Sequence, residues 1–168
     1  TVEFDIAVRP GQTITAKGYD DVEFLISTNP GESLKPLSQV ASGGELSRIM
    51  LAIKTVLAGR DEIDTLIFDE IDTGISGRTA WKVAEQLSVL SGAHQVICIT
   101  HLPQIAAMAD VHFVIEKSST DDMTITDIHK VSAEESLAEL ARLLGSDALT
   151  EAALSNAKEM KEQAGMFK

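Results

Sequence analysis

The sequence predicts an α/β fold: a mostly parallel sheet flanked by helices, with some antiparallel strands. Short apolar runs alternate with amphipathic helical patterns through the middle of the chain, as is typical of strand–helix–strand units. The 168 residues fit one domain, and their 44% hydrophobic content argues against disorder. Aromatic residues make up only 4%, so aliphatic side chains must supply the core.

The chain begins with predicted strands. Residues 2–8 alternate apolar and polar side chains, which favours a half-buried strand, and Pro10-Gly11 is predicted to turn the chain. A second strand is predicted over 22–27. Residues 34–42 show no clear period and are interpreted as a loop.

A strong helix is predicted next, because apolar residues recur at helical spacing after the glycine pair Gly43-Gly44. These residues are Leu46, Ile49, Met50, Ile53 and Leu57. Gly59 is the predicted stop of this helix. The largely apolar run 65–68 then predicts a buried strand of a parallel sheet.

The second half continues the alternation of strands and helices. Its predicted elements are a helix over 77–90, a buried strand over 95–100, a short helix over 103–109, paired strands over 112–117 and 123–130, and helices over 134–144 and 147–164. The polar stretch 118–122 is expected to join the paired strands.

Charge and cysteine usage exclude several classes of function. The net charge of −12 disfavours a nucleic-acid clamp made by this chain itself, since phosphate binding relies on Lys and Arg. The single cysteine, Cys98, excludes an internal disulfide framework and indicates a reducing, cytoplasmic location. No apolar stretch approaches about 18 residues, so no membrane span is predicted. The sequence has no initiator Met, so we expect a piece of a longer protein.

Three features carry chemistry, and the first is Ser42-Gly43-Gly44 at a helix start. Unpaired N–H groups and the positive end of the helix dipole suit a phosphate there, although such a loop is often only a turn. The second is the run 65–68 followed by Asp69-Glu70. This is the Walker B arrangement, in which the Asp helps to hold Mg²⁺ and the Glu activates water.

The third feature is His101, which follows the predicted strand 95–100. Ligands of open α/β sheets bind beyond the carboxyl ends of strands, where a histidine can donate to a γ-phosphate. Alone, a histidine there more often makes a local hydrogen bond. The order and spacing of the three features are those of the second half of an ABC-type ATPase. No Gly is followed by Lys, so the phosphate-cradling P-loop is missing and the chain alone is expected to be inactive.

Four segments resemble the RecN family of SMC-like bacterial ATPases that repair DNA double-strand breaks. They are Lys35-Pro36-Leu37, Val40-Ala41-Ser42-Gly43-Gly44-Glu45-Leu46-Ser47-Arg48, Ile67-Phe68-Asp69-Glu70-Ile71-Asp72 and Thr100-His101-Leu102-Pro103-Gln104. The resemblance implies that residues 1–168 are the C-terminal lobe of an ABC-type ATPase head. The Walker A lobe and coiled-coil arms would precede Thr1. It also implies a role in DNA repair and recombination at the bacterial nucleoid.

The resemblance also implies residue roles. Ser42, Gly43 and Gly44 match the signature loop, which contacts the γ-phosphate of ATP bound to the opposite head. Asp69 matches the Mg²⁺ residue, Glu70 the catalytic base and His101 the switch histidine. The implied cofactors are ATP and Mg²⁺, both requiring the missing lobe. The implied partners are that lobe, a second copy through ATP-bound heads, and DNA through the intact protein, with no membrane.

The motifs depart from the wider superfamily at several positions. Ala41 and Glu45 replace the Leu and Gln of the common signature, and Ser76 stands where the D-loop has Asp. Ile71 stands where ABC transporters usually have Pro, which favours the SMC-like branch. Two alternatives therefore stay open: a dimerisation or docking module with little hydrolysis, and a lobe of another ABC-type ATPase. Arg48 is expected on a solvated helix face.

Overall fold

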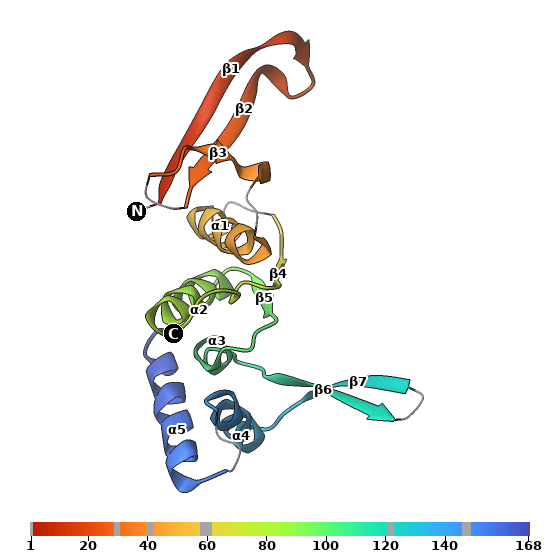
Figure 1. Ribbon diagram of the computed structural model, residues 1–168, viewed down its shortest axis with the longest axis vertical. Coiled ribbons are helices and arrows are strands. Elements are labelled where there is room, and N and C mark those ends of the chain that lie inside the picture. The colour runs from red at the N-terminus through yellow and green to blue at the C-terminus, as the bar shows by residue number, and fades with distance from the viewer. Residues whose placement is uncertain (1, 29–30, 40–41, 58–61, 121–122, 146–148) are drawn as a thin grey trace.

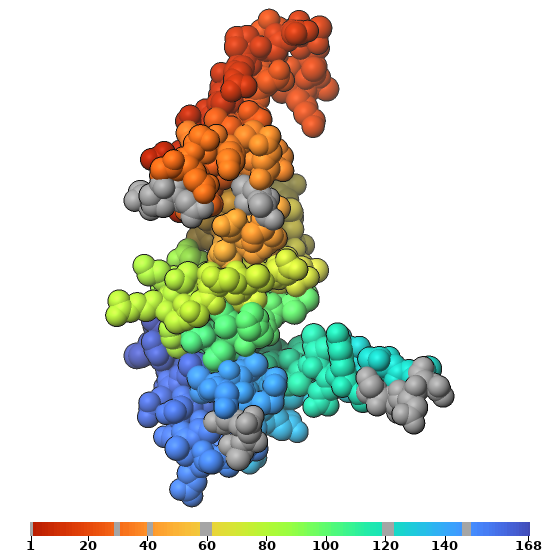
Figure 2. Space-filling view, in the orientation of Figure 1, coloured from red at the N-terminus to blue at the C-terminus, as the bar shows by residue number. Residues whose placement is uncertain are grey.

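The computed structural model describes residues 2–28, 31–39, 42–57, 62–120, 123–145 and 149–168, which form an elongated molecule (Figures 1 and 2). In these ranges the strands form three separate sheets. Antiparallel pairing joins β1 (Glu3–Thr15), β2 (Gly18–Ser27) and β3 (Lys35–Pro36), and also β6 (Phe113–Thr120) and β7 (Met123–Lys130). Parallel pairing joins β4 (Thr65–Phe68) to β5 (Gln95–Cys98).

The mixed α/β class is thus confirmed, although parallel pairing among the described strands is limited to β4 and β5. The helices are η1 (Leu37–Gln39), α1 (Gly43–Val56), α2 (Gly77–Ser91), α3 (Pro103–Ala107), α4 (Ala133–Leu143) and α5 (Glu151–Gly165). Helix α5 begins at Glu151 because the Thr150 side chain caps its first turn. The predicted starting residue, Asp147, and the predicted stop, Gly59, lie outside the described residues.

The predicted turn at Pro10-Gly11 is wrong, because β1 runs through it to Thr15 and the chain turns at Ala16-Lys17. β1 lies at the edge of its sheet, and the register shifts between Pro10 and Thr15. Proline cannot donate an N–H to a neighbouring strand, and it is tolerated at edges and bulges because no such hydrogen bond is required there. Gly11 fits there because a Cβ would collide with the Tyr19 carbonyl across the hairpin.

Other boundaries also differ from the predictions. β2 begins at Gly18 and not at residue 22, and β6 continues to Thr120, so residues 118–120 are strand and not part of the expected connection. The region 34–42 is not all loop, because it contains β3 and the turn η1. β5 ends at Cys98 and not at Thr100, although the Ile99 N–H still donates to the Phe68 carbonyl at 3.0 Å. The β6–β7 hairpin extends from the body, as Figure 1 shows.

The core lies between one face of β4 and the helices. Leu66 and Phe68 point into it from β4, and Ile71 follows with no exposed surface. Helix α2 contributes Val83, Ala84, Leu87 and Leu90, and helices α4 and α5 contribute Leu140, Ala153 and Ala157. Trp81 packs against this core, with its ring 6.2 Å from that of Phe167. Across the described residues, no helix has the length and apolar character needed to cross a membrane.

The opposite face of β4 and β5 is uncovered. Ile67 is 67% exposed, Ile97 45% and Ile99 48%. The apolar face of the β1–β2 hairpin is also exposed, including Phe4 and Phe24, whose stacked rings lie 5.9 Å apart. Exposed apolar sheet surface of this kind is typical of a face that packs against further protein.

Candidate functional site

The start of α1 carries the predicted phosphate loop. Ser42 is the N-cap, with an extended backbone, and its Oγ accepts a hydrogen bond from the Glu45 N–H at 3.3 Å. The Ser42 carbonyl accepts the Leu46 N–H at 3.1 Å, which closes the first turn. Ala41 lies outside the described residues. The loop therefore ends in a capped helix start whose dipole favours an anion.

The acidic pair Asp69-Glu70 follows the carboxyl end of β4, and both side chains are exposed. The Asp69 carboxylate accepts the Glu70 N–H at 2.9 Å. Glu70 has a φ of 57°, in the left-handed region, and no other described non-glycine residue has a positive φ. That conformation costs about 1–2 kcal/mol for a residue with a Cβ, and such strain concentrates at functional sites.

The glycine pair packs directly on this acidic turn. A Cβ on Gly43 would collide with the Glu70 carboxylate, and one on Gly44 would lie 2.8 Å from the Glu70 carbonyl oxygen. The Ser47 hydroxyl donates to the Asp69 carbonyl at 2.9 Å, which joins α1 to the same turn. The two motifs, separated in sequence, are therefore in contact.

Arg48 adds a second connection between α1 and the segment after β4. Its Nη1 donates to the Ile71 carbonyl at 3.1 Å and to the Thr73 carbonyl at 2.9 Å. Arg48 is expected on a solvated face, but it is only half-exposed and is bound to this segment. Helical spacing alone does not show which segment passes beside the helix.

Substituting Gly44 by alanine is expected to destabilise the chain by about 1–3 kcal/mol, as overpacking does. The added Cβ would meet the Glu70 carbonyl at 2.8 Å and the Thr73 Cβ at 3.1 Å. Gly92→Ala is the matched control, because its nearest neighbour lies 3.4 Å away. Urea denaturation of both variants measures the difference. Equal midpoints for the two variants would show that Gly44 is not required for close packing.

His101 lies just beyond β5 and is held by a residue that sequence reasoning missed. The Asp72 side chain is buried, and its Oδ2 accepts the His101 N–H at 2.8 Å and the Thr100 hydroxyl at 2.6 Å. The same oxygen lies 3.0 Å from the His101 Nδ1. The one sequence signal for Asp72 is that a carboxylate follows soon after a buried strand. This signal does not show that His101 is its partner.

The predicted residues thus meet along one edge, at the carboxyl ends of β4 and β5. Gly43 and Gly44 adjoin Glu70, and Asp72 connects the turn after β4 to His101. Cys98 lies beside this edge. Burial, followed by the nearby charges of Asp72 and Asp69, raises the pKa of its thiol to about 12. The thiol therefore stays protonated near neutral pH and is not a nucleophile.

The carboxylates at the end of β4 could supply some of the ligands of a Mg²⁺ ion, but not a complete set. In the described ranges, no group of three or more His, Cys, Asp or Glu residues is arranged to hold a metal ion. Mg²⁺ at nucleotide sites usually takes one or two carboxylates, with the remaining ligands from phosphates and water. Asp69, exposed at the end of β4, fits such a role.

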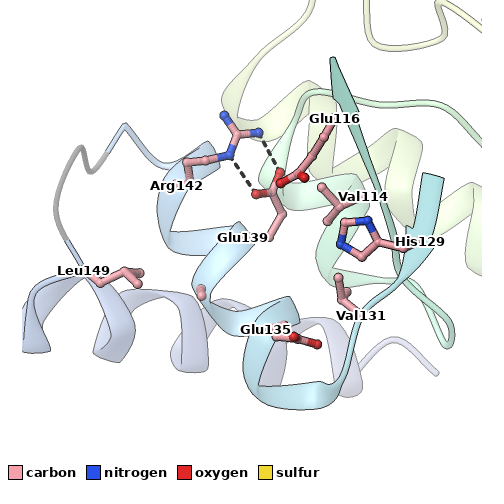
Figure 3. Close-up of a pocket in the computed structure, with 9 residues that line it drawn as sticks. Val114, Glu116, His129, Val131, Glu135, Glu139, Arg142 and Leu149 are labelled. Carbon is pink, nitrogen blue, oxygen red and sulfur yellow. Dashed lines mark hydrogen bonds and ion pairs between the residues drawn. The ribbon is translucent and has the colours of Figure 1, made fainter. Parts of the chain in front are cut away.

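A separate pocket lies between the β6–β7 hairpin and α4, with a volume of about 400 Å³ (Figure 3). Glu116, Glu135 and Glu139 give its wall an acidic character. Arg142 donates to Glu139 at 2.7 and 2.6 Å, which neutralises part of this charge. None of the predicted site residues lines this pocket.

No family model matches the chain. Over 92% of its length it is 49% identical to the DNA repair protein RecN of Bacillus subtilis, and it covers 27% of that protein. It is 54% identical to RecN of Treponema pallidum over 85% of its length, covering 25% of that protein. It is 44% identical to RecN of Halalkalibacterium halodurans over 99% of its length, covering 30% of that protein. The chain thus spans less than a third of these curated relatives.

A solved structure from work on the ATP-driven dimerization and DNA-stimulated activation of SMC ATPases has a similar fold. The TM-score is 0.50 at 20% identity, over 86% of this chain and 84% of the solved chain. At this identity the likeness is one of fold, and it confirms the predicted SMC-type head fold.

Proposed function

Because this chain belongs to the RecN family, as the counterpart of its C-terminal region, we propose that residues 1–168 form the C-terminal lobe of an ATPase head that acts in DNA double-strand-break repair. One observation carries the proposal. The acid pair after β4 and His101 after β5 share one sheet edge, while the sequence contains no P-loop. A site with these parts needs a phosphate cradle from elsewhere.

The proposed chemistry assigns each residue a task. The amides of Gly43 and Gly44 and the Ser42 hydroxyl bind the γ-phosphate of ATP held by the opposite head. Glu70 accepts the proton of the attacking water, and His101 donates a hydrogen bond to the γ-phosphate. Mg²⁺, held with help from Asp69, would neutralise charge that develops on the phosphate oxygens.

The partners follow from the same arrangement. The missing Walker A lobe packs against the exposed Ile67, Ile97 and Ile99 face in the intact protein. Two ATP-bound heads then close into a dimer, and hydrolysis of the ATP lets the two heads separate. DNA contacts come from other parts of the intact protein, since this chain carries a net charge of −12.

Complementation between two inactive variants of the full-length protein tests the shared site. Glu70→Gln removes the base of one site, and Ser42→Arg blocks the loop that serves the other. Each variant alone is expected to hydrolyse ATP poorly. A mixed dimer carries one intact site, so equal mixing restores about a quarter of wild-type turnover if subunits exchange freely in a two-fold dimer.

A mixture no more active than its components, despite subunit exchange, would contradict sharing of the site between heads. The assembly alternative makes a different prediction. If wild-type heads dimerise without ATP and do not hydrolyse it, the lobe is a docking module and Glu70 is not a base. Light scattering with and without ATP, beside phosphate release, distinguishes the two functions.

A further inference from the structure

Asp72 makes an unusual set of contacts for a buried carboxylate. Its side chain is 3% exposed, and a single oxygen, Oδ2, accepts from the Thr100 hydroxyl at 2.6 Å and the His101 N–H at 2.8 Å. The His101 ring nitrogen Nδ1 lies 3.0 Å from the same oxygen. Two of these three contacts are with His101.

Burial gives this arrangement its rigidity. Removing a carboxylate from water is costly unless hydrogen bonds compensate, so the oxygen is held where its donors converge. Thr100 is itself oriented, because its hydroxyl accepts the Leu102 N–H at 3.0 Å. The turn after β4 and the loop after β5 are therefore connected at one fixed acceptor.

The imidazole, by contrast, is largely in solvent, with 70% of the His101 side chain exposed. An exposed ring without a partner would rotate among several orientations. The 3.0 Å between Nδ1 and the Asp72 Oδ2 is the distance of an ion pair when the ring is protonated. The Asp72 contact therefore holds Nδ1 on the side of the buried carboxylate. Nε2, on the other side of the ring, is left for another partner, to which it donates a hydrogen bond when the ring is protonated.

We propose that Asp72 is a positioning residue for His101: it orients the imidazole so that Nε2 is presented to the nucleotide. This inference rests on the proposed function, since it deepens the role assigned to His101. Asp72 does not touch the substrate and acts only through the ring. Its contribution is therefore an orientation effect on the chemical step and not on nucleotide affinity.

A double-mutant cycle in the full-length protein tests the inference through ATP hydrolysis. Asp72→Asn and Asp72→Ala are each made alone and with His101→Ala. We expect Asp72→Ala to lower kcat by about 10- to 100-fold, with KM within about 3-fold of wild type. In the His101→Ala background the same substitution is expected to cause no further loss, because its effect depends on the ring.

Stability is controlled separately, since Asp72→Ala leaves buried donors without an acceptor. Asp72→Asn keeps an oxygen at this position. If the alanine variant folds poorly, the double-mutant cycle with His101→Ala is measured with Asp72→Asn instead. Ser136→Ala is the control for general destabilisation. Ser136 lies in α4, and its buried hydroxyl forms a hydrogen bond of 2.9 Å with Nδ1 of His112. Removing this hydroxyl is expected to lower the melting temperature without changing kcat.

Additive losses at Asp72 and His101 would overturn the inference, as would wild-type kcat in both Asp72 variants. Either result leaves the proposed ATPase function intact, because that function is tested at Glu70. Wild-type kcat in His101→Ala removes the role of the ring, and the inference with it. If Ser136→Ala lost as much kcat as the Asp72 variants, loss of stability alone would explain the effect at Asp72. That result would also overturn the inference.

Discussion

Replacing Glu70 by glutamine is expected to lower kcat for ATP hydrolysis by the full-length protein by about 10²- to 10⁴-fold. Glutamine has the shape of glutamate but cannot accept a proton from water, so the variant is expected to retain nucleotide binding and to lose the proposed base. Its backbone must still adopt the φ of 57° found at Glu70, which makes the isosteric change preferable to alanine. Phosphate release under saturating ATP measures the effect.

The same variant is expected to form ATP-dependent dimers that persist longer than those of the wild type, because hydrolysis separates the heads in the proposed mechanism. Glu62→Gln is the matched control, since it neutralises an exposed carboxylate that precedes β4. It is expected to leave both turnover and dimer lifetime unchanged. If kcat of Glu70→Gln stays within about 3-fold of wild type, the assigned base is wrong.

Replacing Ile71 by alanine is expected to destabilise the chain by about 2–5 kcal/mol. Ile71 has no exposed surface and lies in the core between the acidic turn and Asp72. Truncation leaves a cavity that the surrounding side chains fill only in part, so lost burial and the cavity both contribute. Urea denaturation followed by circular dichroism measures the change in midpoint.

Two further variants make this prediction specific. Ile71→Val removes one methylene and is expected to cost only about 0.5–1.5 kcal/mol. Ile67→Ala truncates the same residue type on β4 at a side chain that is 67% exposed, so its cost in this chain is expected to be much smaller. Similar midpoints for the Ile71→Ala and Ile67→Ala variants would contradict the core position of Ile71.

Sequence patterns located most elements because they depend on neighbouring residues alone. The spacing of apolar side chains predicted α1, α2, β4 and β7 close to their observed bounds. The site residues were found in the same way, as short motifs at the ends of such elements. Their catalytic roles stay predictions, while their meeting at one edge is observed for Gly43, Glu70 and His101.

The sequence by itself therefore determined the α/β class and the motifs, since periodicity and strand-end chemistry are local properties. Only the tertiary structure decided which distant groups touch. It placed the hairpin turn at Ala16-Lys17 through cross-strand register, and it brought Arg48 to the carbonyls after β4. It also buried Asp72 against His101, because that contact requires β4 and β5 to end side by side, a condition set by chain packing and absent from either segment alone.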